Sequence, residues 1–386
     1  MNRPEPTREA ALRRLTAFVP DAGKYAGRRN FDFGPDDRSN VSTLSPYLRT
    51  RLVTEKEVCL AVLERFARST VDKFLQEVAW RTYWKGWLEM RPEVWSRYRL
   101  DLEQREHSPE HERAIRGETG IECFDFWVRE LIETGYLHNH ARMWFAGIWI
   151  FTLRLPWQMG ADFFLRHLLD GDPASNTLSW RWVAGLHTTG KHYLARASNI
   201  KRFTGGRFDP AGQLDESAPA LPPDGEFERR DLDFPENPRP GARLGQLLIP
   251  DDLTPIGMPQ VESTAGWFPE DSRVLGDPSE KVVDFHRGAL DDALSRTGGP
   301  RLRGRLSESV RDWATREKLD AIIMTRPTVG PWRDLFAGFD PGVPVHHFVS
   351  DWDRQLWPHA TAGFFRLKKR LPKFFDALVS GQRSLF

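Results

Sequence analysis

The sequence lacks most of the features that mark secreted, membrane-spanning and metal-cluster proteins. Its 386 residues include only two cysteines, Cys59 and Cys123, too few for a disulfide framework or a four-thiolate iron–sulfur site. The N-terminus has no apolar core of a secretory signal. Arg154 and Pro156 interrupt the longest apolar run, so no membrane span is expected. The formal net charge is +1, and no global field attracts nucleic acid. We therefore expect a soluble, cytoplasmic protein.

The chain is rich in aromatic residues, with 15 Trp and 25 Phe. Such enrichment is typical of large cores and interfaces, and also of sites where flat ligands stack. A chain of this length usually forms two domains. We predict a mainly α-helical domain over residues 1–205, a linker or wrapping segment rich in Gly, Pro and acidic residues over 206–250, and a small α/β module over 251–386.

The stretch 134–182 concentrates polar groups among tryptophans. Asn139, Arg142 and Met143 have the spacing that puts them on one face of a helix. After an apolar stretch, the sequence DGDPASN brings two carboxylates and an amide into one turn, and tryptophans follow at once. Fixed polar groups beside several large rings favour a site for a flat aromatic ligand. A buried Arg–Asp pair in a helical core is the alternative.

The segment VSTLSPYL at 41–48 places a group of hydroxyls ahead of a predicted helix. Free N–H groups and the helix dipole favour an anion such as phosphate at such a place. An ordinary N-cap at Ser45, with Pro46 as the first helical residue, explains the same pattern.

A predicted helix over 71–90 carries a mixed stripe. Glu77, Trp80, Arg81 and Trp84 fall at i, i+3, i+4 and i+7, which places them on one face. A core stripe is purely apolar, so this one indicates either the wall of a site or a half-exposed helix.

A local basic run follows the central stretch. It suggests contact with a phosphodiester backbone, although a run of charge is usually only a solvated face. Its members are Lys191, Arg196, Lys201, Arg202 and Arg207.

Other patterns predict the course of the chain. Residues 7–19 predict an amphipathic helix with Thr7 as N-cap. The charged residues 100–117, interrupted by Pro109, predict a solvated connection.

The C-terminal part has a different pattern. Short apolar runs at 320–325 and 344–348 predict two buried strands, the first of them parallel. Helical patterns at 286–296 and 305–317 precede them, which favours a small α/β unit.

Four ordered motifs together resemble the flavin-binding half of the cryptochrome/photolyase family. They are STLSPYL, QEVAWRT, YLHNHARM and DGDPASNTLSWRW, and the similarity extends from about Tyr25 to Asn199. The family normally carries an α/β antenna domain before this half, and this chain begins almost at the first helix of the flavin domain. It therefore looks like the short branch of the family, the short photocryptochromes, with its C-terminal strands as a reduced α/β module.

The resemblance implies a non-covalent FAD buried in a helical domain. The hydroxyl segment would hold the diphosphate, with Thr43 at a place where Arg is common. Arg142 and Asp170 would flank the isoalloxazine, Asp172 would accept a hydrogen bond from its polar edge, and Asn176 would face flavin N5, as in photolyases. The implied cofactor-binding residues are Tyr25, Ser42, Thr43, Leu44, Ser45, Arg81, Arg142, Asp170, Asp172 and Asn176.

The resemblance also implies a site for a cyclobutane pyrimidine dimer flipped out of DNA. His140 departs from the family pattern, in which an Arg that contacts DNA is common, and we assign it to substrate binding. The other implied groups are two aromatic walls, two hydrogen-bonding side chains and one apolar contact: Trp80 and Trp182, Glu77 and Asn139, and Met143.

Photoreduction of the flavin needs a relay of aromatic residues toward the surface. Trp180 and Trp157 match the first two members of the family's tryptophan chain. The third position falls within 100–117, which contains no Trp. Trp149 or Tyr98 would end the chain instead.

The leading interpretation is light-dependent repair of cyclobutane pyrimidine dimers by electron transfer from photoexcited reduced FAD. A short architecture leaves less surface for duplex DNA, so we expect single-stranded DNA to be preferred. A photoreceptor that signals through flavin photoreduction without repair is the second interpretation. A DNA-binding or structural protein without flavin is the third. The dimer-contact residues favour the first over the second, and the flavin-facing residues count against the third.

Overall fold

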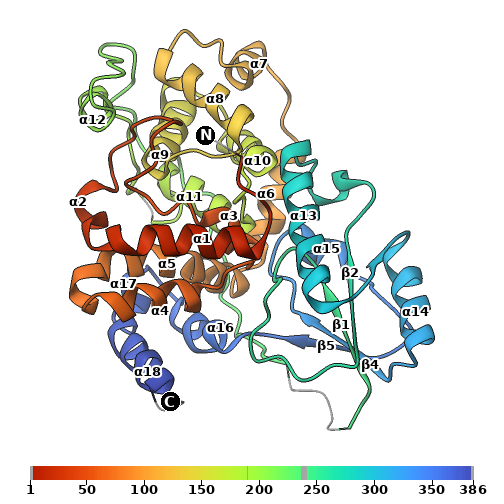
Figure 1. Cartoon of the computed structure of the whole chain (residues 1–386). Helices are drawn as coiled ribbons and strands as arrows, with labels where there is room; N and C mark the ends of the chain where they lie inside the picture. The colour runs from red at the N-terminus through yellow and green to blue at the C-terminus, as the bar shows by residue number, and fades with distance from the viewer. Residues whose placement is uncertain (1–2, 189, 236–240, 384–386) are drawn as a thin grey trace.

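The chain folds into a helical part and an α/β part, which lie side by side (Figure 1). The computed structural model describes residues 3–188, 190–235 and 241–383. In the described residues up to Phe203, all elements of regular secondary structure are helices. These elements are α1 (Arg8–Phe18), η1 (Val19–Lys24), α2 (Tyr25–Arg28), α3 (Ser45–Arg49), α4 (Glu55–Arg65), α5 (Arg68–Glu89), α6 (Glu93–Glu103), α7 (Pro109–Arg116), α8 (Glu122–Thr134), α9 (Asn139–Gly147), η2 (Ile148–Thr152), α10 (Trp157–His167), α11 (Pro173–Ala184) and α12 (Ala197–Phe203).

The α/β part follows, and the chain then ends in helices that return to the helical part. These elements are β1 (Leu244–Leu248), β2 (Ser263–Trp267), η3 (Ser272–Leu275), α13 (Glu280–Thr297), β3 (Arg301–Leu302), α14 (Leu306–Glu317), β4 (Ala321–Thr325), α15 (Pro331–Leu335), β5 (Val345–Phe348), α16 (Asp351–Leu356), η4 (Trp357–His359), α17 (Phe365–Lys368) and α18 (Leu371–Arg383). The predicted fold class, mainly α-helical with a small α/β segment, is confirmed.

Side-chain caps explain where several helices begin. The Thr7 hydroxyl accepts from the Ala10 N–H at the start of α1, as predicted. Thr54 and Glu57 form a reciprocal capping box at the start of α4. Each cap satisfies an N–H group that the helix itself leaves free.

The predicted connection over 100–117 is exposed to solvent at residues 103–107, as expected, but most of the stretch is helical. Helix α6 continues to Glu103, and α7 begins at Pro109, where the Ser108 hydroxyl accepts from the His111 N–H. A proline is tolerated in the first turn because its missing N–H would have no partner there. Pro109 therefore begins a helix rather than interrupting one.

The sheet is wholly parallel, with strand order β3-β2-β1-β4-β5. The parallel β4 confirms the sequence-based expectation, but the module is larger than the two predicted strands. Strand β1 begins at Leu244, so the linker predicted to end at residue 250 ends earlier. The sequence of β1, LGQLL, is buried at every position, but its Gly and Gln break the apolar run that would have indicated a strand.

Helices approach both faces of this sheet over glycines. A Cβ on Gly245 of β1 would lie 2.6 Å from the Trp313 ring of α14, and one on Gly266 of β2 would lie 2.8 Å from Leu290 of α13. In the register of the two strands, Gly245 pairs with Ser263 of β2. Gly266 is three residues after Ser263, and successive residues of a strand alternate between the two faces of the sheet, so the two glycines lie on opposite faces. Helices α14 and α13 therefore cover opposite faces, as in doubly wound folds.

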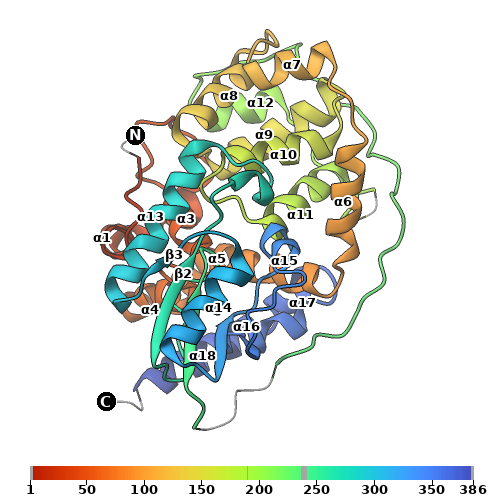
Figure 2. The same ribbon diagram turned by 90° about the vertical axis from the view of Figure 1, so that its right-hand side faces the viewer.

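An extended segment joins the two parts and runs along the outside of the molecule, as Figure 2 shows. Arg181 of α11 is ion-paired with Asp224, and the Arg230 N–H donates to the Met90 carbonyl over 2.8 Å. The Arg354 guanidinium donates to the Pro235 carbonyl over 2.7 Å. These contacts fix an irregular segment against the ends of several helices.

The two parts share one continuous hydrophobic core. Helix α13 packs against β2 on one side and against α1 and α10 on the other, while α16 and η4 pack on α5. Gly86 of α5 permits this approach, because a Cβ there would lie 2.9 Å from the Trp357 backbone. None of the helices in the described ranges is both long and apolar enough to cross a membrane.

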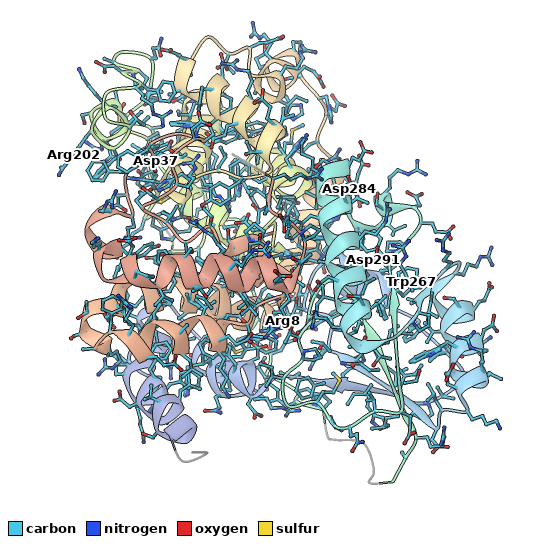
Figure 3. The ribbon with its side chains drawn as sticks, in the orientation of Figure 1. Arg8, Asp37, Arg202, Trp267, Asp284 and Asp291 are labelled. Atoms are coloured by element: carbon cyan, nitrogen blue, oxygen red, sulfur yellow. The ribbon has the colours of Figure 1, made fainter. Side chains whose placement is uncertain are left out.

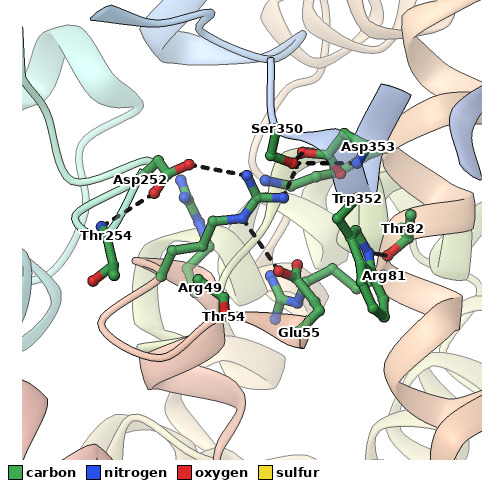
Figure 4. A network of polar contacts seen from close by, with 12 residues as sticks. Arg49, Thr54, Glu55, Arg81, Thr82, Asp252, Thr254, Ser350, Trp352 and Asp353 are labelled. Carbon is green, nitrogen blue, oxygen red and sulfur yellow. Dashed lines mark hydrogen bonds and ion pairs between the residues drawn. The ribbon is translucent and has the colours of Figure 1, made fainter. Parts of the chain in front are cut away.

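Buried ion pairs cross between the two parts (Figure 4). Arg51, whose φ is 50°, donates to Glu55 over 3.2 Å, to Asp252 over 3.0 Å and to Asp353 over 2.6 Å. All four side chains are at most 6% exposed. Asp252 follows β1 and Asp353 lies in α16, so one guanidinium joins three segments.

Arg49 makes a second connection. Its Nε donates to the Gly171 carbonyl over 2.9 Å, and its Nη1 donates to Asp251 over 2.6 Å. Asp251 also accepts from the Thr328 hydroxyl over 3.2 Å. Gly171 lies between the two aspartates of the DGD sequence, so the α/β part supports that turn from behind. We call Arg49, Arg51, Glu55, Asp251, Asp252 and Asp353 the interface cluster.

Candidate functional site

Helices α5, α9 and α11 form the framework of the site, because α11 packs against both of the others. Asn139, Arg142 and Met143 all lie on α9, and Asp172 caps the N-terminus of α11. The stripe that contains Glu77, Trp80 and Arg81 lies on α5. The three helices therefore bring the two predicted groups of site residues together.

Asp172 is held at the inner end of the site. It is 1% exposed, and its Oδ1 accepts from the Ser175 N–H over 2.8 Å. The cationic groups of Lys85 and Arg81 lie 3.6 and 3.7 Å from its other oxygen. Burial opposes ionisation of Asp172, but the charges of Lys85, Arg81 and Arg49 outweigh it and hold its pKa below the ordinary value.

Asp170 and Arg142 form the predicted pair. The Arg142 Nη2 donates to Asp170 over 2.8 Å, and its Nε donates to the Leu137 carbonyl. Burial by itself would raise the pKa of Asp170. The charge and hydrogen bond of Arg142, together with a contact with the Ser45 side chain, have the larger opposite effect, so the pKa of Asp170 lies below its ordinary value. We call Arg81, Lys85, Arg142, Asp170 and Asp172 the flavin cluster.

The hydroxyl segment reaches the same place. Ser45 lies beside Asp170, and its carbonyl is 3.5 Å from Arg81 Nη2. Thr43 has a φ of 50°, a left-handed conformation that is unfavourable for a β-branched residue and is found most often at functional sites. Helix α3 begins at Ser45 with Leu44, not Ser45, as its N-cap.

Several buried polar atoms of this region have no hydrogen-bond partner among the described residues. Buried polar groups are normally hydrogen-bonded, so this concentration fits a polar ligand that would supply the missing partners. The atoms are Arg81 Nη1, Asp170 Oδ1, Asp172 Oδ2, Ser175 Oγ and Thr177 Oγ1. They include a guanidinium nitrogen, carboxylate oxygens and hydroxyls, the donors and acceptors that the phosphates and the polar ring edge of FAD require.

Asn176 lies one turn into α11. Its Nδ2 donates to the Ala161 carbonyl of α10 over 2.8 Å, and the residue is 8% exposed. That bond orients the amide and leaves its oxygen available as an acceptor.

The residues predicted to contact a dimer are more accessible than Lys85, Asp170 and Asp172, whereas Arg81 and Arg142 are half-buried. Asn139 is exposed, and Glu77, Trp80, Met143 and Trp182 are half-buried. The site thus has a buried polar end and a half-open end with aromatic and hydrogen-bonding side chains. Such a gradient suits a cofactor held inside and a substrate that enters from outside.

Two of these side chains already have strong partners. Glu77 pairs with Arg29 over 2.9 Å and with Lys73 over 3.1 Å. The Trp80 ring is stacked on Phe364, with centroids 3.8 Å apart and an interplanar angle of 11°.

His140 and Tyr25 lie toward the Glu77 side. The His140 ring is within hydrogen-bonding distance of the Asn30 carbonyl, at 2.9 Å, and stacks on Trp144. Tyr25 meets Phe74 edge to face, and burial followed by the charge of Glu77 raises the pKa of its hydroxyl. The roles of both residues stay predictions.

The two tryptophans predicted for electron transfer have different neighbours. Trp180 of α11 meets Trp149 of η2 edge to face, with ring centroids 6.2 Å apart. Trp157 stacks on Tyr98 with centroids 5.6 Å apart, and Tyr98 in turn lies 5.3 Å from Trp95. Trp149 and Tyr98, the two residues suggested as the end of the electron-transfer relay, therefore each contact one of its tryptophans. Each of the two is at most 1% exposed.

The basic run over 191–207 is partly neutralised. Lys201 pairs with Asp209 over 2.7 Å, and Arg207 pairs with Asp32 over 3.0 Å. Arg202 projects from the edge of the molecule (Figure 3). Fewer cations of this run are therefore available to contact a phosphodiester backbone than the sequence suggests.

Sequence reasoning missed Lys85 and Arg49. Lys85 is four residues after Arg81 on α5, so helical spacing alone placed it on the same face. Arg49 had no such signal, since its partners Gly171 and Asp251 are far away in the sequence.

The comparisons with known proteins match this part of the chain. Residues 74–215 match the family model described as the FAD binding domain of DNA photolyase. A deoxyribodipyrimidine photo-lyase of Streptomyces griseus is 32% identical over 226 residues, covering 54% of this chain and 48% of that protein. One of Alkalihalophilus pseudofirmus is 30% identical over 211 residues, covering 53% and 43%. The crystal structure of a class III photolyase from Agrobacterium tumefaciens aligns with a TM-score of 0.43 and 27% identity, covering 52% and 43%.

This chain thus spans about half the length of the curated relatives that it matches. The matched residues contain most of α5, all of α9 and α11, and all of the flavin cluster. The expected cofactor, FAD, is confirmed by this domain. Residues 74–215 therefore resemble the FAD-binding domain of the cryptochrome/photolyase family.

Proposed function

We propose that this protein repairs cyclobutane pyrimidine dimers in DNA in a light-dependent reaction. The observation that carries the proposal is the two-ended site: a buried polar cluster with unsatisfied atoms, and a half-open end lined by Glu77, Trp80 and Asn139. The curated relatives, named deoxyribodipyrimidine photo-lyases, support the same activity.

Each group of residues has a role in this proposal. The flavin cluster and Asn176 would hold FAD, which in its reduced, photoexcited form would supply the electron needed to split the dimer. Trp80 and Trp182 exclude water and stack on the extruded bases. Glu77 and Asn139 hydrogen-bond the base edges, and Met143 fills the space between base and helix. Trp180 and Trp157 carry electrons toward the flavin when it must be reduced.

We also propose a preference for single-stranded DNA. A dimer in a single strand needs no base pair to be broken before it is extruded, so the cost of flipping is smaller. Equal binding and repair of duplex and single-stranded substrates in matched titrations would argue against this preference. A cytoplasmic location stays a prediction of the sequence.

The test is illumination of the flavin-reduced protein with oligo(dT) that contains dimers, followed by measurement of dimer loss. Glu77→Gln and Asn139→Ala should each reduce repair at least tenfold and leave the bound FAD spectrum unchanged. Glu308→Gln, on exposed α14, is the matched control and should repair normally. No dimer loss by the unaltered protein would contradict the proposal.

A photoreceptor without repair is the second candidate. It is favoured by the stacking of Phe364 on Trp80 and by the two cations that neutralise Glu77, which occupy groups that a dimer would need. Photoreduction with no dimer loss at any DNA concentration would select this function.

A further inference from the structure

The segment 364–373 carries a surface that the proposed site does not use. Phe365 is 73% exposed, more than any other large hydrophobic side chain in the described ranges. Cations surround it along the chain. We call the following residues the α17 patch: Phe365, Arg366, Lys368, Lys369, Arg370 and Lys373.

The cations of the α17 patch are not neutralised. Within the described part of the chain, no carboxylate lies within 4.0 Å of any of them. The nearest acid in the sequence, Asp376, pairs with Arg68 instead. Burial, followed by the charges of Arg370 and Arg366, lowers the pKa of His359.

The patch is fixed beside the half-open end of the site. Phe364 stacks on Trp80, and the Tyr83 hydroxyl donates to the Ala362 carbonyl over 2.8 Å. Ala362 and Phe364 immediately precede α17, so they hold the start of that helix near α5. Phe365 and its cations therefore begin one residue beyond the wall that a flipped dimer would stack on.

We propose that the α17 patch binds the DNA strand that flanks the lesion, as a site for single-stranded phosphodiester with one stacked base. The inference rests on the proposed function for the position of the lesion. Unpaired Arg and Lys side chains neutralise successive phosphates. An exposed aromatic ring among them offers a stacking platform for an unpaired base of any sequence.

The chemistry of the patch favours nucleic acid over a lipid surface. Helix α17 has only four residues, too short for an amphipathic helix that lies in a membrane interface. Phe365 is a single ring surrounded by charge rather than part of an apolar face. Interleaved basic and aromatic side chains are the pattern expected for a strand of unpaired nucleotides.

The experiment measures binding of fluorescently labelled, undamaged oligo(dT) to the FAD-loaded full chain in the dark, over a range of salt concentrations. The test variant is Arg366→Gln/Lys369→Gln/Arg370→Gln. It should bind at least tenfold more weakly, and the slope of log Kd against log salt should fall by about two, since each lost phosphate contact in a single strand contributes about 0.7. Phe365→Ala should weaken binding about fivefold or more with no change in slope.

The matched control is Arg303→Gln/Arg305→Gln/Arg316→Gln, three exposed cations of the α/β part. It should leave affinity and slope unchanged, and the FAD spectrum and Tm of all variants should match the parent. An unchanged slope in the α17 variant overturns the inference. Binding of phosphatidylserine vesicles that depends on the patch, with oligo(dT) binding unaffected, overturns it in favour of lipid.

Because the assay uses undamaged DNA in the dark, it does not depend on repair. Patch-dependent binding without dimer loss would support the DNA surface and contradict the proposed activity. Dimer loss together with DNA binding that does not depend on the patch would support the proposed activity and contradict the DNA surface.

Discussion

The flavin cluster and the interface cluster are both sets of basic and acidic side chains inside the protein, but their burial and contacts differ. Every member of the interface cluster is buried, whereas Arg81 and Arg142 of the flavin cluster are half-buried. In the interface cluster, Arg49 and Arg51 donate to carboxylates over 2.6 to 3.2 Å. In the flavin cluster, Asp172 is 3.6 Å or more from both of its cations, and three of the five side chains have an unpartnered atom.

The difference shows what each cluster contributes. A buried charge costs free energy unless it is paired and hydrogen-bonded. The interface cluster meets that condition within the chain at every described buried side-chain atom except Asp353 Oδ1, so it stabilises the fold and joins the two parts. The flavin cluster meets it only partly, so its remaining atoms are free to bind a ligand. Arg49 connects the two clusters, because it bonds both Gly171 and Asp251.

The largest effect on stability is expected for Arg51→Met. The substitution leaves Glu55, Asp252 and Asp353 buried without their common cation, which should lower the free energy of unfolding by about 3–5 kcal/mol. For a chain of this size the Tm should fall by about 5 °C. Urea titration and thermal melting measure both. A variant as stable as the parent would show that the interface cluster does not hold the two parts together.

Asp251→Asn should produce a smaller and pH-dependent loss. Burial opposes ionisation of Asp251, but Arg49 outweighs it and lowers the pKa well below the ordinary value. A carboxylate with a lowered pKa contributes stability above its unfolded pKa of about 3.9 and loses it as the pH falls further. The variant should therefore be less stable by on the order of 2 kcal/mol at pH 7, with a smaller difference near pH 3. Equal differences at both pH values, measured by urea titration, would contradict the assigned cause.

Asp172→Asn should affect the ligand more than the fold. The amide still caps α11 through the Ser175 N–H, but it no longer offers a charged acceptor. Loss of one charged hydrogen bond weakens binding by about tenfold or more, so FAD should dissociate more readily. Titration of apoprotein with FAD measures the affinity. A fall in apoprotein Tm as large as that of Arg51→Met would remove the distinction between the clusters.

The smallest effect is expected for an exposed pair of similar geometry. Arg273 donates to Asp271 over 2.7 and 2.8 Å, but the side chains are 76% and 51% exposed. Exposed pairs contribute little because water and salt screen them. Arg273→Met should leave the Tm unchanged within error, which makes it the control for Arg51→Met. A clear loss of stability would mean that short distance, rather than burial, decides the contribution of an ion pair here.

Local patterns predicted the local structure well. Thr7 does cap α1, and the spacing of Asn139, Arg142 and Met143 does place them on one helix. The helices within 100–117 were missed because charge and Pro109 suggested solvent, whereas the proline begins α7. Strand β1 was missed because a central strand that is buried on both faces shows no alternation of polar and apolar residues in its own sequence. Its burial comes from the strands and helices packed around it.

The candidate site was predicted where its residues are close in the sequence. The stretch 134–182 contains the DGD turn and the α9 side chains, and its motifs led to the family whose FAD-binding domain residues 74–215 match. The stacking of Phe364 on Trp80, and the support of Gly171 by Arg49, join residues more than a hundred positions apart. No single-sequence pattern contains such pairs.

The sequence by itself determined several helices, the Thr7 cap and which polar side chains share one face of α5 and one face of α9, because spacing along a helix fixes which residues share a face. Only the tertiary structure decided which of the buried charges are satisfied. Hydrogen bonding between Arg51 and Asp353, and the unpartnered oxygens of Asp170 and Asp172, depend on how segments distant in the chain pack together. That packing separates the charges that stabilise this fold from those left available to bind FAD.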